Sequence, residues 1–372
     1  MIFYITIVFL LFYIFIMLVY GYKLIYFKKD VYLNEASEFL ISILVAARNE
    51  EENILDCLIA LNLLDYDKNK MEILIGNDDS TDKTQSIIES FIKDKPQFKL
   101  INIKNDEPSN TKGKARVLAI LAAKGKGDIF LITDADIKVN ENWANGMVQY
   151  FKSDKIAMIG ATTSIKSDVF LGFIQKLDWM YFMGIINVLG KINRPITMVG
   201  NNMAFTKKAY EEIGGYNAIP FSITEDYALF HAFRKKGLKT KQILNLETLS
   251  FSKPAITFKA ILTQRKRWLQ GGLSMPLFFK ILIFVFSLWY FFLPILFFFN
   301  WKLALLLFVC KNFIQLLQLH KLFQLIQAKA PSILLGVCFE IYLFLVIPLT
   351  GLSLFLGGKS LWKGRRYSML IK

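Results

Sequence analysis

Histidine and cysteine are scarce in this chain of 372 residues, which contains two histidines and three cysteines. His231 and His320 lie far apart in the sequence, which argues against histidine-based catalysis and against a zinc site. Cys57, Cys310 and Cys338 are also widely separated, and the last two fall in apolar segments. Their spacing indicates neither a disulfide framework nor a metal cluster.

Glycine-rich phosphate-binding loops are also missing. No Gly-x-Gly-x-x-Gly fingerprint follows the first predicted strand, and no glycine-rich loop ends in Lys-Ser or Lys-Thr. The run Lys124–Gly127 is too short to form either loop. The sequence therefore disfavours hydride transfer with a dinucleotide and nucleotide hydrolysis of the P-loop type.

Hydrophobic residues, in contrast, make up 54% of the chain and include 34 Phe, which is more than an ordinary soluble fold carries. Residues 1–22 form an apolar run of membrane-spanning length, followed by Lys23, Lys28 and Lys29. A signal peptide has its charges before the apolar core and a small-residue cleavage site after it, and this run has neither. We therefore expect an uncleaved transmembrane anchor, with its N-terminus outside and the next domain in the cytoplasm.

The C-terminal region, residues 277–358, is expected to contain further transmembrane helices. The candidate segments are Ile281–Phe299, Leu303–Leu319 and Ile333–Leu356. The second is borderline because of Lys311 and Gln315. Three spans would place the basic tail, residues 359–372, outside the cell, against the positive-inside tendency. We favour two true spans and one shallow or re-entrant segment, which returns the tail to the cytoplasm.

A net charge of +15 is compatible with nucleic acid, but also with anionic lipid headgroups and a diphosphate ligand. The chain has no zinc-finger spacing and no Arg-rich tail. Together with the predicted membrane segments, this favours membrane lipids as partners and no nucleic acid.

Strand and helix patterns alternate between residues 39 and 134. The predicted strands are residues 39–46, 72–76 and 98–103 and the apolar run that opens the stretch 130–137. The predicted helices are residues 50–64, 83–91 and 114–123. Ser80 and Thr81 are expected to cap the second helix, with Asp82 in its first turn. The alternation predicts an α/β fold with a parallel sheet and a ligand-binding crevice at the carboxyl ends of its strands.

Two carboxylates, Asp134 and Asp136, follow the last of these strands. Side chains two residues apart on an extended backbone point the same way, so both can face one hard cation. Mg²⁺ or Mn²⁺ would suit such a pair, with diphosphate oxygens in the remaining positions. Alone, an Asp-x-Asp triplet is equally consistent with a solvated turn.

A later helix is predicted to run to about Lys236, with Thr224 as its cap. Glu225 and Asp226 then lie in its first turn, where the helix dipole favours their charged forms. Both are candidates for a general base, although Asp226 could simply cap the helix.

Two further segments are predicted to be amphipathic helices. Val169–Leu189 is too polar to span a membrane comfortably and is expected to lie on the bilayer or under the domain. Thr257–Gly272 resembles a basic surface helix, but it carries Trp268 among its basic residues. In this segment Arg267 could bind either a lipid phosphate or a ligand.

Five motifs together carry a family resemblance. They are Asn49-Glu-Glu, Asn77-Asp-Asp-Ser-Thr-Asp, Asp134-Ala-Asp, Thr224-Glu-Asp and Gln264-x-x-Arg-Trp. In this order they resemble the membrane-bound family 2 glycosyltransferases, among them cellulose, chitin, hyaluronan and poly-N-acetylglucosamine synthases and ceramide glucosyltransferases. The resemblance covers about residues 38–275. It implies a GT-A domain, which is a Rossmann-like nucleotide-diphospho-sugar transferase fold, at residues 38–255, and an interfacial helix at residues 256–276.

The resemblance also implies roles for individual residues. Donor or nucleotide binding falls to Arg48, Glu50, Asp78, Asp79, Lys114, Asp134 and Arg267. Asp134 and Asp136 would bind the metal, and Gln264 and Trp268 would bind the acceptor. Asp226 would be the general base, with Glu225 as the alternative. Asp79 stands where the usual pattern has Gly, which leaves the choice between Asp78 and Asp79 open.

The expected protein is an integral membrane glycosyltransferase of the plasma or inner membrane, with its catalytic domain in the cytoplasm. It would transfer a sugar from a nucleotide-sugar donor, UDP-glucose or UDP-N-acetylglucosamine, to a lipid or polysaccharide acceptor by an inverting single displacement. Few predicted spans favour a lipid acceptor or a short transfer over export of a long polymer. The alternatives are a glycoside hydrolase, a metal-dependent phosphodiesterase, and a binding scaffold without chemistry.

Overall fold

The computed structural model of the protein describes residues 1–33, 38–104, 111–152, 155–355, 360–362 and 365–367. These form two compact units. We call residues 29–164 and 190–253 the sheet unit, and residues 1–28, 165–189 and 254–372 the helical unit. Most of the predicted basic tail lies outside the described residues.

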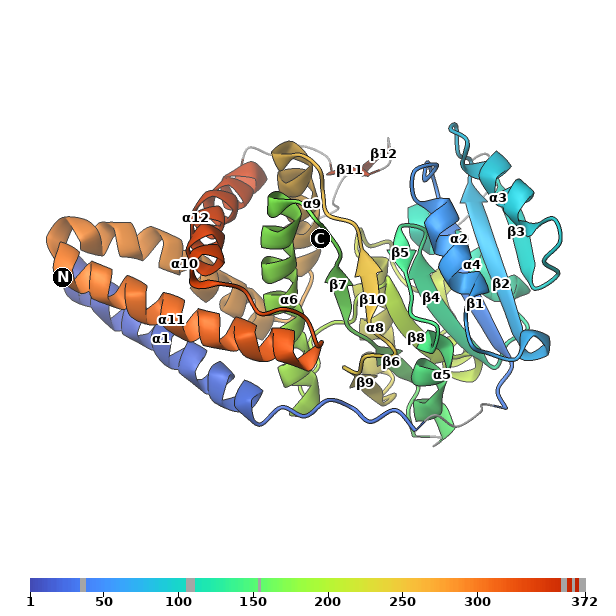
Figure 1. Ribbon diagram of the computed structural model, residues 1–372, viewed down its shortest axis with the longest axis horizontal. Coiled ribbons are helices and arrows are strands. Elements are labelled where there is room, and N and C mark those ends of the chain that lie inside the picture. The colour runs from blue at the N-terminus through green and yellow to red at the C-terminus, as the bar shows by residue number, and fades with distance from the viewer. Residues whose placement is uncertain (34–37, 105–110, 153–154, 356–359, 363–364, 368–372) are drawn as a thin grey trace. The chain divides into compact units, whose positions relative to one another are not determined.

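The sheet unit is built on a seven-stranded sheet of order β3-β2-β1-β4-β8-β6-β9. Its strands are β1 (Ile41–Ala47), β2 (Met71–Asp78), β3 (Phe98–Ile103), β4 (Ile129–Asp134), β6 (Met158–Gly160), β8 (Asn202–Thr206) and β9 (Thr240–Gln242). The strands β3, β2, β1 and β4 are parallel, while β8 runs antiparallel to β4 and β6 (Figure 1). A small second sheet has the order β5 (Ile137–Lys138), β10 (Ser250–Ser252), β7 (Thr163–Ile165).

The parallel register brings three polar segments to one edge of the sheet. Ala47 of β1 pairs with Asn77 of β2, and Ala46 pairs with Asp134 of β4. The chain therefore leaves all three strands at the same level. This is the edge at which a ligand-binding crevice is predicted.

Helices of the sheet unit follow the predicted alternation closely. They are α2 (Ile54–Asn62), α3 (Thr84–Ile92), α4 (Gly113–Lys124), α5 (Trp143–Val148), α7 (Lys207–Glu212) and α8 (Glu225–Lys235), with short 3-10 turns at Lys68–Lys70, Gln149–Lys152 and Tyr216–Ala218. Helix α2 buries Leu58 and Leu61 completely in the main core cluster. Helix α4 lies close to β2, since a Cβ added at Gly76 would be 2.4 Å from the Val117 side chain. A glycine is therefore needed at position 76 for α4 to pack at this distance.

The predicted cap of α3 was wrong. Ser80 and Thr81 do not cap this helix, which begins at Thr84. Both residues instead bond to Asn49 in the neighbouring loop, where Ser80 Oγ accepts from the Asn49 N–H at 3.1 Å and the Thr81 N–H donates to Asn49 Oδ1 at 2.9 Å. Asp82 lies before the helix rather than in its first turn, and its side chain accepts from the Thr84 N–H at 3.0 Å.

The helical unit contains six helices in its described part (Figure 1). They are α1 (Ile2–Ile25), α6 (Phe170–Lys191), α9 (Phe258–Gly272), α10 (Leu277–Phe299), α11 (Trp301–Leu325) and α12 (Ile333–Phe355); a hairpin of β11 (Ser360–Trp362) and β12 (Arg365–Tyr367) follows. Among the described residues, α1, α10, α11 and α12 are long and apolar enough to cross a membrane. Helix α11 is continuous over 25 residues, so its shape gives no support to the shallow or re-entrant segment favoured above. How many of the four helices cross the membrane stays a prediction.

Three polar residues of α11, Lys311, Gln315 and Gln318, are buried within the helical unit. Lys311 and Glu340 of α12 are fully buried and form an ion pair. Lys311 also donates to Gln315 Oε1 at 2.8 Å and to the Tyr290 hydroxyl at 3.4 Å. The polar stripe that made this segment borderline in sequence is thus paired inside the helix bundle, as charges within membranes generally are.

Candidate active site

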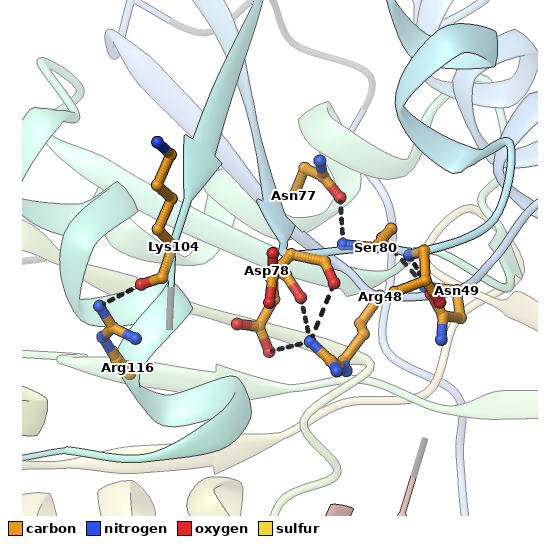
Figure 2. A network of polar contacts seen from close by, with 9 residues as sticks. Arg48, Asn49, Asn77, Asp78, Ser80, Lys104 and Arg116 are labelled. Carbon is orange, nitrogen blue, oxygen red and sulfur yellow. Dashed lines mark hydrogen bonds and ion pairs between the residues drawn. The ribbon is translucent and has the colours of Figure 1, made fainter. Parts of the chain in front are cut away.

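Arg48 organises the first part of the site. It follows β1, and its Nη1 donates to the backbone carbonyl of Asp78 and, at 3.2 Å, to that of Asp79 (Figure 2). The same Nη1 is 4.0 Å from Asp78 Oδ2. One guanidinium therefore fixes both the backbone and the carboxylate of the turn after β2.

The two candidate nucleotide residues differ sharply in environment. Asp78 is 3% exposed, whereas Asp79 is exposed and has a φ of 53°. This is the left-handed region that glycine enters freely and that Asp tolerates better than most residues. The glycine expected at this position is thus replaced by a residue that keeps its backbone conformation. The facing Asn49 also has a positive φ, of 51°.

Glu50 lies in the same loop region, at the approach to α2, and is 8% exposed. Its carboxylate accepts from Asn53 Nδ2 at 2.9 Å, and its backbone N–H donates to Thr84 Oγ1 at 2.7 Å. These contacts join the loop after β1 to the start of α3.

Sequence reasoning gave no role to two residues of this region, Arg116 and Asn77, the second of which it named only as the start of a motif. Asn77 accepts from the Ser80 N–H at 3.3 Å and donates to Asn102 Oδ1 at 2.9 Å. Arg116, on α4, is 7% exposed and donates to the Lys104 carbonyl at 2.8 Å (Figure 2). An arginine on a helix ordinarily indicates a solvated surface, so no sequence signal separated it from the other basic residues.

The centre of the site is an ion cluster built from three elements. Lys114 of α4 lies with its Nζ 2.5 Å from Asp134 Oδ1, at the end of β4, and 2.9 Å from Glu225 Oε1, at the start of α8. All three side chains are mostly buried. The structure therefore brings together three residues that the sequence analysis had singled out separately.

Burial and mutual charge shift the pKa values in this cluster. Burial raises the pKa of Asp134 to about 6, although the Lys114 ammonium opposes that shift. Burial alone would lower the pKa of Lys114, but the charges of Asp134 and Glu225 outweigh it and raise the pKa above its usual range. Lys114 therefore stays charged.

Asp226 is the neighbouring carboxylate on α8, and it is held by backbone groups. Its Oδ2 accepts from the Gly200 N–H at 2.8 Å, and its Oδ1 accepts from the Tyr227 N–H at 2.7 Å. Burial and the adjacent charge of Glu225 raise the pKa of Asp226 to about 6. A Cβ at Gly200 would lie 2.7 Å from the Asp226 Cβ, so this glycine makes room for the carboxylate. Sequence reasoning gave Gly200 no role in the site.

Asp136 follows β4 and is partly exposed. Within the described ranges, no group of three or more His, Cys, Asp or Glu residues could hold a metal ion. The Asp134 and Asp136 carboxylates supply hard oxygen ligands of the type that Mg²⁺ and Mn²⁺ prefer. The residues therefore fit a site in which protein supplies few ligands and a diphosphate supplies others.

The remaining predicted residues, Gln264, Arg267 and Trp268, lie on α9 in the helical unit. The Trp268 ring centroid is 5.0 Å from that of Trp179 on α6. The predicted site residues are thus divided between the two units.

A sheet whose parallel strands end together beside a buried cluster of one lysine and two carboxylates is typical of transferases of the GT-A fold. The chain belongs to glycosyl transferase family 21, whose family model matches residues 8–371. The resemblance drawn from the five motifs, to membrane-bound glycosyltransferases of the GT-A fold, is confirmed.

Two curated relatives are similar in sequence. A β-monoglucosyldiacylglycerol synthase of Synechocystis sp. is 28% identical over 238 residues, which cover 62% of this chain and 47% of the relative. A poly-β-1,6-N-acetyl-D-glucosamine synthase of Staphylococcus aureus is 29% identical over 253 residues, 66% of this chain and 57% of the relative. The chain spans about half the length of these relatives.

A solved structure supports the fold. A mannosyltransferase of Pyrobaculum calidifontis, in complex with GDP-Man and Mn²⁺, superposes with a TM-score of 0.58 and covers 95% of both chains. The two sequences are 16% identical, so the likeness concerns the fold alone.

Proposed function

We propose that the protein transfers a sugar from UDP-glucose or UDP-N-acetylglucosamine to an acceptor by inverting single displacement, and that the acceptor is a lipid or a short glycan at the membrane. The observation that carries the proposal is the cluster of Asp134, Lys114 and Glu225 beside Asp226, at the carboxyl ends of the parallel strands. The Lys114 ammonium can balance the negative charge of a diphosphate, and the Asp226 carboxylate can remove a proton from the acceptor. The two curated relatives, which by name make a glucosyl lipid and an N-acetylglucosamine polymer, support the choice of these two sugars and of a lipid or glycan acceptor.

The nucleotide end of the donor would bind along the turn after β2. Asp78 is the stronger candidate for the nucleobase or ribose, because Arg48 fixes its carboxylate and its backbone together. Asp79 is exposed, so it would contact the nucleotide only from the solvent side. Glu50 would support this turn through its loop contacts.

The diphosphate would bind near the ion cluster. Asp134 and Asp136 would hold Mg²⁺ or Mn²⁺, which when bound neutralises charge on the leaving diphosphate. Lys114 would compensate the remaining negative charge, because it stays protonated between its carboxylates. On α9, Arg267 would bind the donor, while Gln264 and Trp268 would hold the acceptor; an indole offers a sugar or lipid headgroup a flat apolar face.

Asp226 would act as the general base. An acceptor hydroxyl is a weak nucleophile until a carboxylate removes its proton, and a base pKa near the working pH serves this best. The pKa of Asp226, raised to about 6, is well matched, and the hydrogen bonds from Gly200 and Tyr227 hold the carboxylate in place. Glu225 is less free for this role because it bonds to Lys114 at 2.9 Å.

The membrane arrangement follows from the four candidate spans. The protein would be integral to the plasma or inner membrane, with the sheet unit in the cytoplasm, where nucleotide sugars are made. A reporter fused within the sheet unit that is active only outside the cell would contradict this orientation.

The function is tested by a transfer assay on membranes that contain the full chain, with labelled UDP- and GDP-sugars and Mg²⁺ or Mn²⁺. We expect one donor to label a lipid or glycan fraction, and EDTA to abolish the transfer until the metal is restored. Asp136→Asn should need more metal for half-maximal rate, since it removes one anionic ligand.

Other outcomes would favour other functions. Release of sugar phosphate or nucleotide without an acceptor indicates a phosphodiesterase. Release of sugar from a glycoside that persists in EDTA indicates a glycosidase. A donor that is bound but never consumed with any acceptor indicates a binding scaffold.

The rate should depend on pH with an unusual acidic limb. Because Asp226 works as a base in its ionised form, kcat/KM should fall at least tenfold per pH unit below about pH 6, rather than below the usual range of an Asp near pH 4. Asp134 titrates in the same range, so the limb reports both carboxylates. The measurement is kcat/KM across the acidic and neutral range at constant ionic strength. A rate that stays flat down to about pH 4.5 would contradict a base with a raised pKa.

A further inference from the structure

An ion pair lies within the helical unit, close to the motif residues of α9. Arg265 of α9 pairs with Asp178 of α6 through its Nη2. The Tyr342 hydroxyl of α12 also donates to Asp178, at 3.2 Å. The side chains of Asp178 and Arg265 are 15% and 19% exposed. Three helices therefore meet at one mostly buried carboxylate.

The same arginine lies against the motif tryptophan. The Arg265 guanidinium carbon is 4.8 Å from the centroid of the Trp268 ring, a cation–π contact. The Trp179 ring, one residue along α6 from Asp178, is 5.0 Å from the Trp268 ring at an interplanar angle of 42°. Two consecutive residues of α6 thus act on Trp268: Trp179 contacts its ring directly, and Asp178 pairs with the arginine that stacks on it.

Stability alone is a poor reason for this arrangement. Desolvating a charged pair is expensive, and well-packed apolar residues often replace such a pair without loss of stability. In the described part of the chain, the buried Arg265 Nε also has no hydrogen-bond partner. What the pair does supply is orientation, because a guanidinium is planar and stacks on an aromatic ring, whereas an ammonium is a point charge.

We propose that Asp178, acting through Arg265, and Trp179 are positioning residues that hold the Trp268 indole in the orientation that receives the acceptor. The inference rests on the proposed role of Trp268 in acceptor binding. It adds Arg265, which the motif pattern leaves unspecified, and a pair of α6 residues that belong to no motif.

The test uses the full chain in detergent micelles, with labelled UDP-glucose as donor and a short-chain diacylglycerol as the acceptor probe. Arg265→Lys keeps a positive charge for Asp178 but removes the planar face against Trp268. We expect the KM for the acceptor to rise roughly 3- to 10-fold, the range of a partly desolvated cation–π contact. The KM for the donor and the thermal unfolding temperature should stay close to those of the wild type.

Trp179→Leu tests the direct ring contact and leaves the ion pair intact, so it also serves if Arg265→Lys fails to fold. It should raise the acceptor KM in the same way, and the double variant should lose less than the two single effects combined, because both act on one ring. Lys259→Gln is the matched control, since Lys259 is an exposed cation on the same helix. It should leave both KM values unchanged.

The outcomes separate this inference from the proposed function. If the wild type transfers sugar and both variants keep its acceptor KM, the positioning role is wrong and the function stands. If the variants change the KM for donor and acceptor alike, or only the unfolding temperature, the network is merely structural. If the wild type transfers no sugar to the diacylglycerol from either UDP-glucose or UDP-N-acetylglucosamine, the lipid acceptor is wrong, and this inference falls with it.

Discussion

Replacing Asp226 with Asn is expected to lower kcat roughly 10²- to 10⁴-fold, the contribution that a general base typically makes. The amide keeps the size of the side chain, and its oxygen can still accept from the Gly200 N–H, a bond of 2.8 Å in the native protein. It cannot remove a proton from the acceptor. The affinity for donor nucleotide, measured by isothermal titration or fluorescence, should therefore change little while turnover collapses.

Glu225→Gln is the matched comparison because it lies one residue away on α8. Glu225 is already bonded to Lys114, so this variant should weaken donor binding more than it lowers kcat. If Asp226→Asn transfers sugar as fast as the wild type and Glu225→Gln does not, the two assignments must be exchanged. If neither variant loses kcat, the base lies elsewhere.

Much of the sheet unit could be predicted because its central strands β1, β2 and β4 are buried on both faces. Such strands form continuous apolar runs that are hard to confuse with other elements once helices alternate with them. The predicted end of the first strand differs from that of β1 by one residue. The edge strand β3 is only partly buried, yet the predicted strand Phe98–Ile103 coincides with it at both ends. The polar segments at the strand ends then had to converge, because parallel strands align their carboxyl ends.

The contacts inside the site could not be predicted, because they depend on distant elements. Nothing in the local pattern around Lys114 indicates that its ammonium joins Asp134 to Glu225. The error at the cap of α3 has the same origin. Ser80 and Thr81 are good caps by local preference, but Asn49 in another loop competes for them and is better placed.

The membrane segments show a related effect. Lys311 made one segment borderline on composition, since a charge facing lipid is unfavourable. The structure places Glu340, Gln315 and Tyr290 around it, and these come from α12, from one turn further along α11 and from α10. Mean hydropathy is an average over all faces of a helix, so it does not show which face carries the charged residue.

Lys114→Met should have the largest effect on the sheet unit as a whole. It removes the cation that pairs with Asp134 at 2.5 Å and with Glu225 at 2.9 Å. Both carboxylates are then left mostly buried without their partner, and we expect a loss of about 2 to 3 kcal/mol in the free energy of unfolding, below the full figure for a completely buried pair. Chemical denaturation of the full chain in detergent, followed at neutral pH, measures this.

The same substitution should change the pH dependence in a direction set by charge. Burial raises the pKa of Asp226 and the Lys114 ammonium opposes that rise, so without Lys114 the pKa should rise further and the acidic limb of kcat/KM should move above about pH 6. Lys112→Met, which removes an exposed cation at the cap of α4, is the control and should leave both stability and the limb unchanged. A limb that stays in place in Lys114→Met while stability falls would mean that the lysine holds the fold but does not set the charge state of the base. Since Lys114 bonds to the carboxylate at the end of β4 and to the one that opens α8, we expect stability and proton affinity to change together.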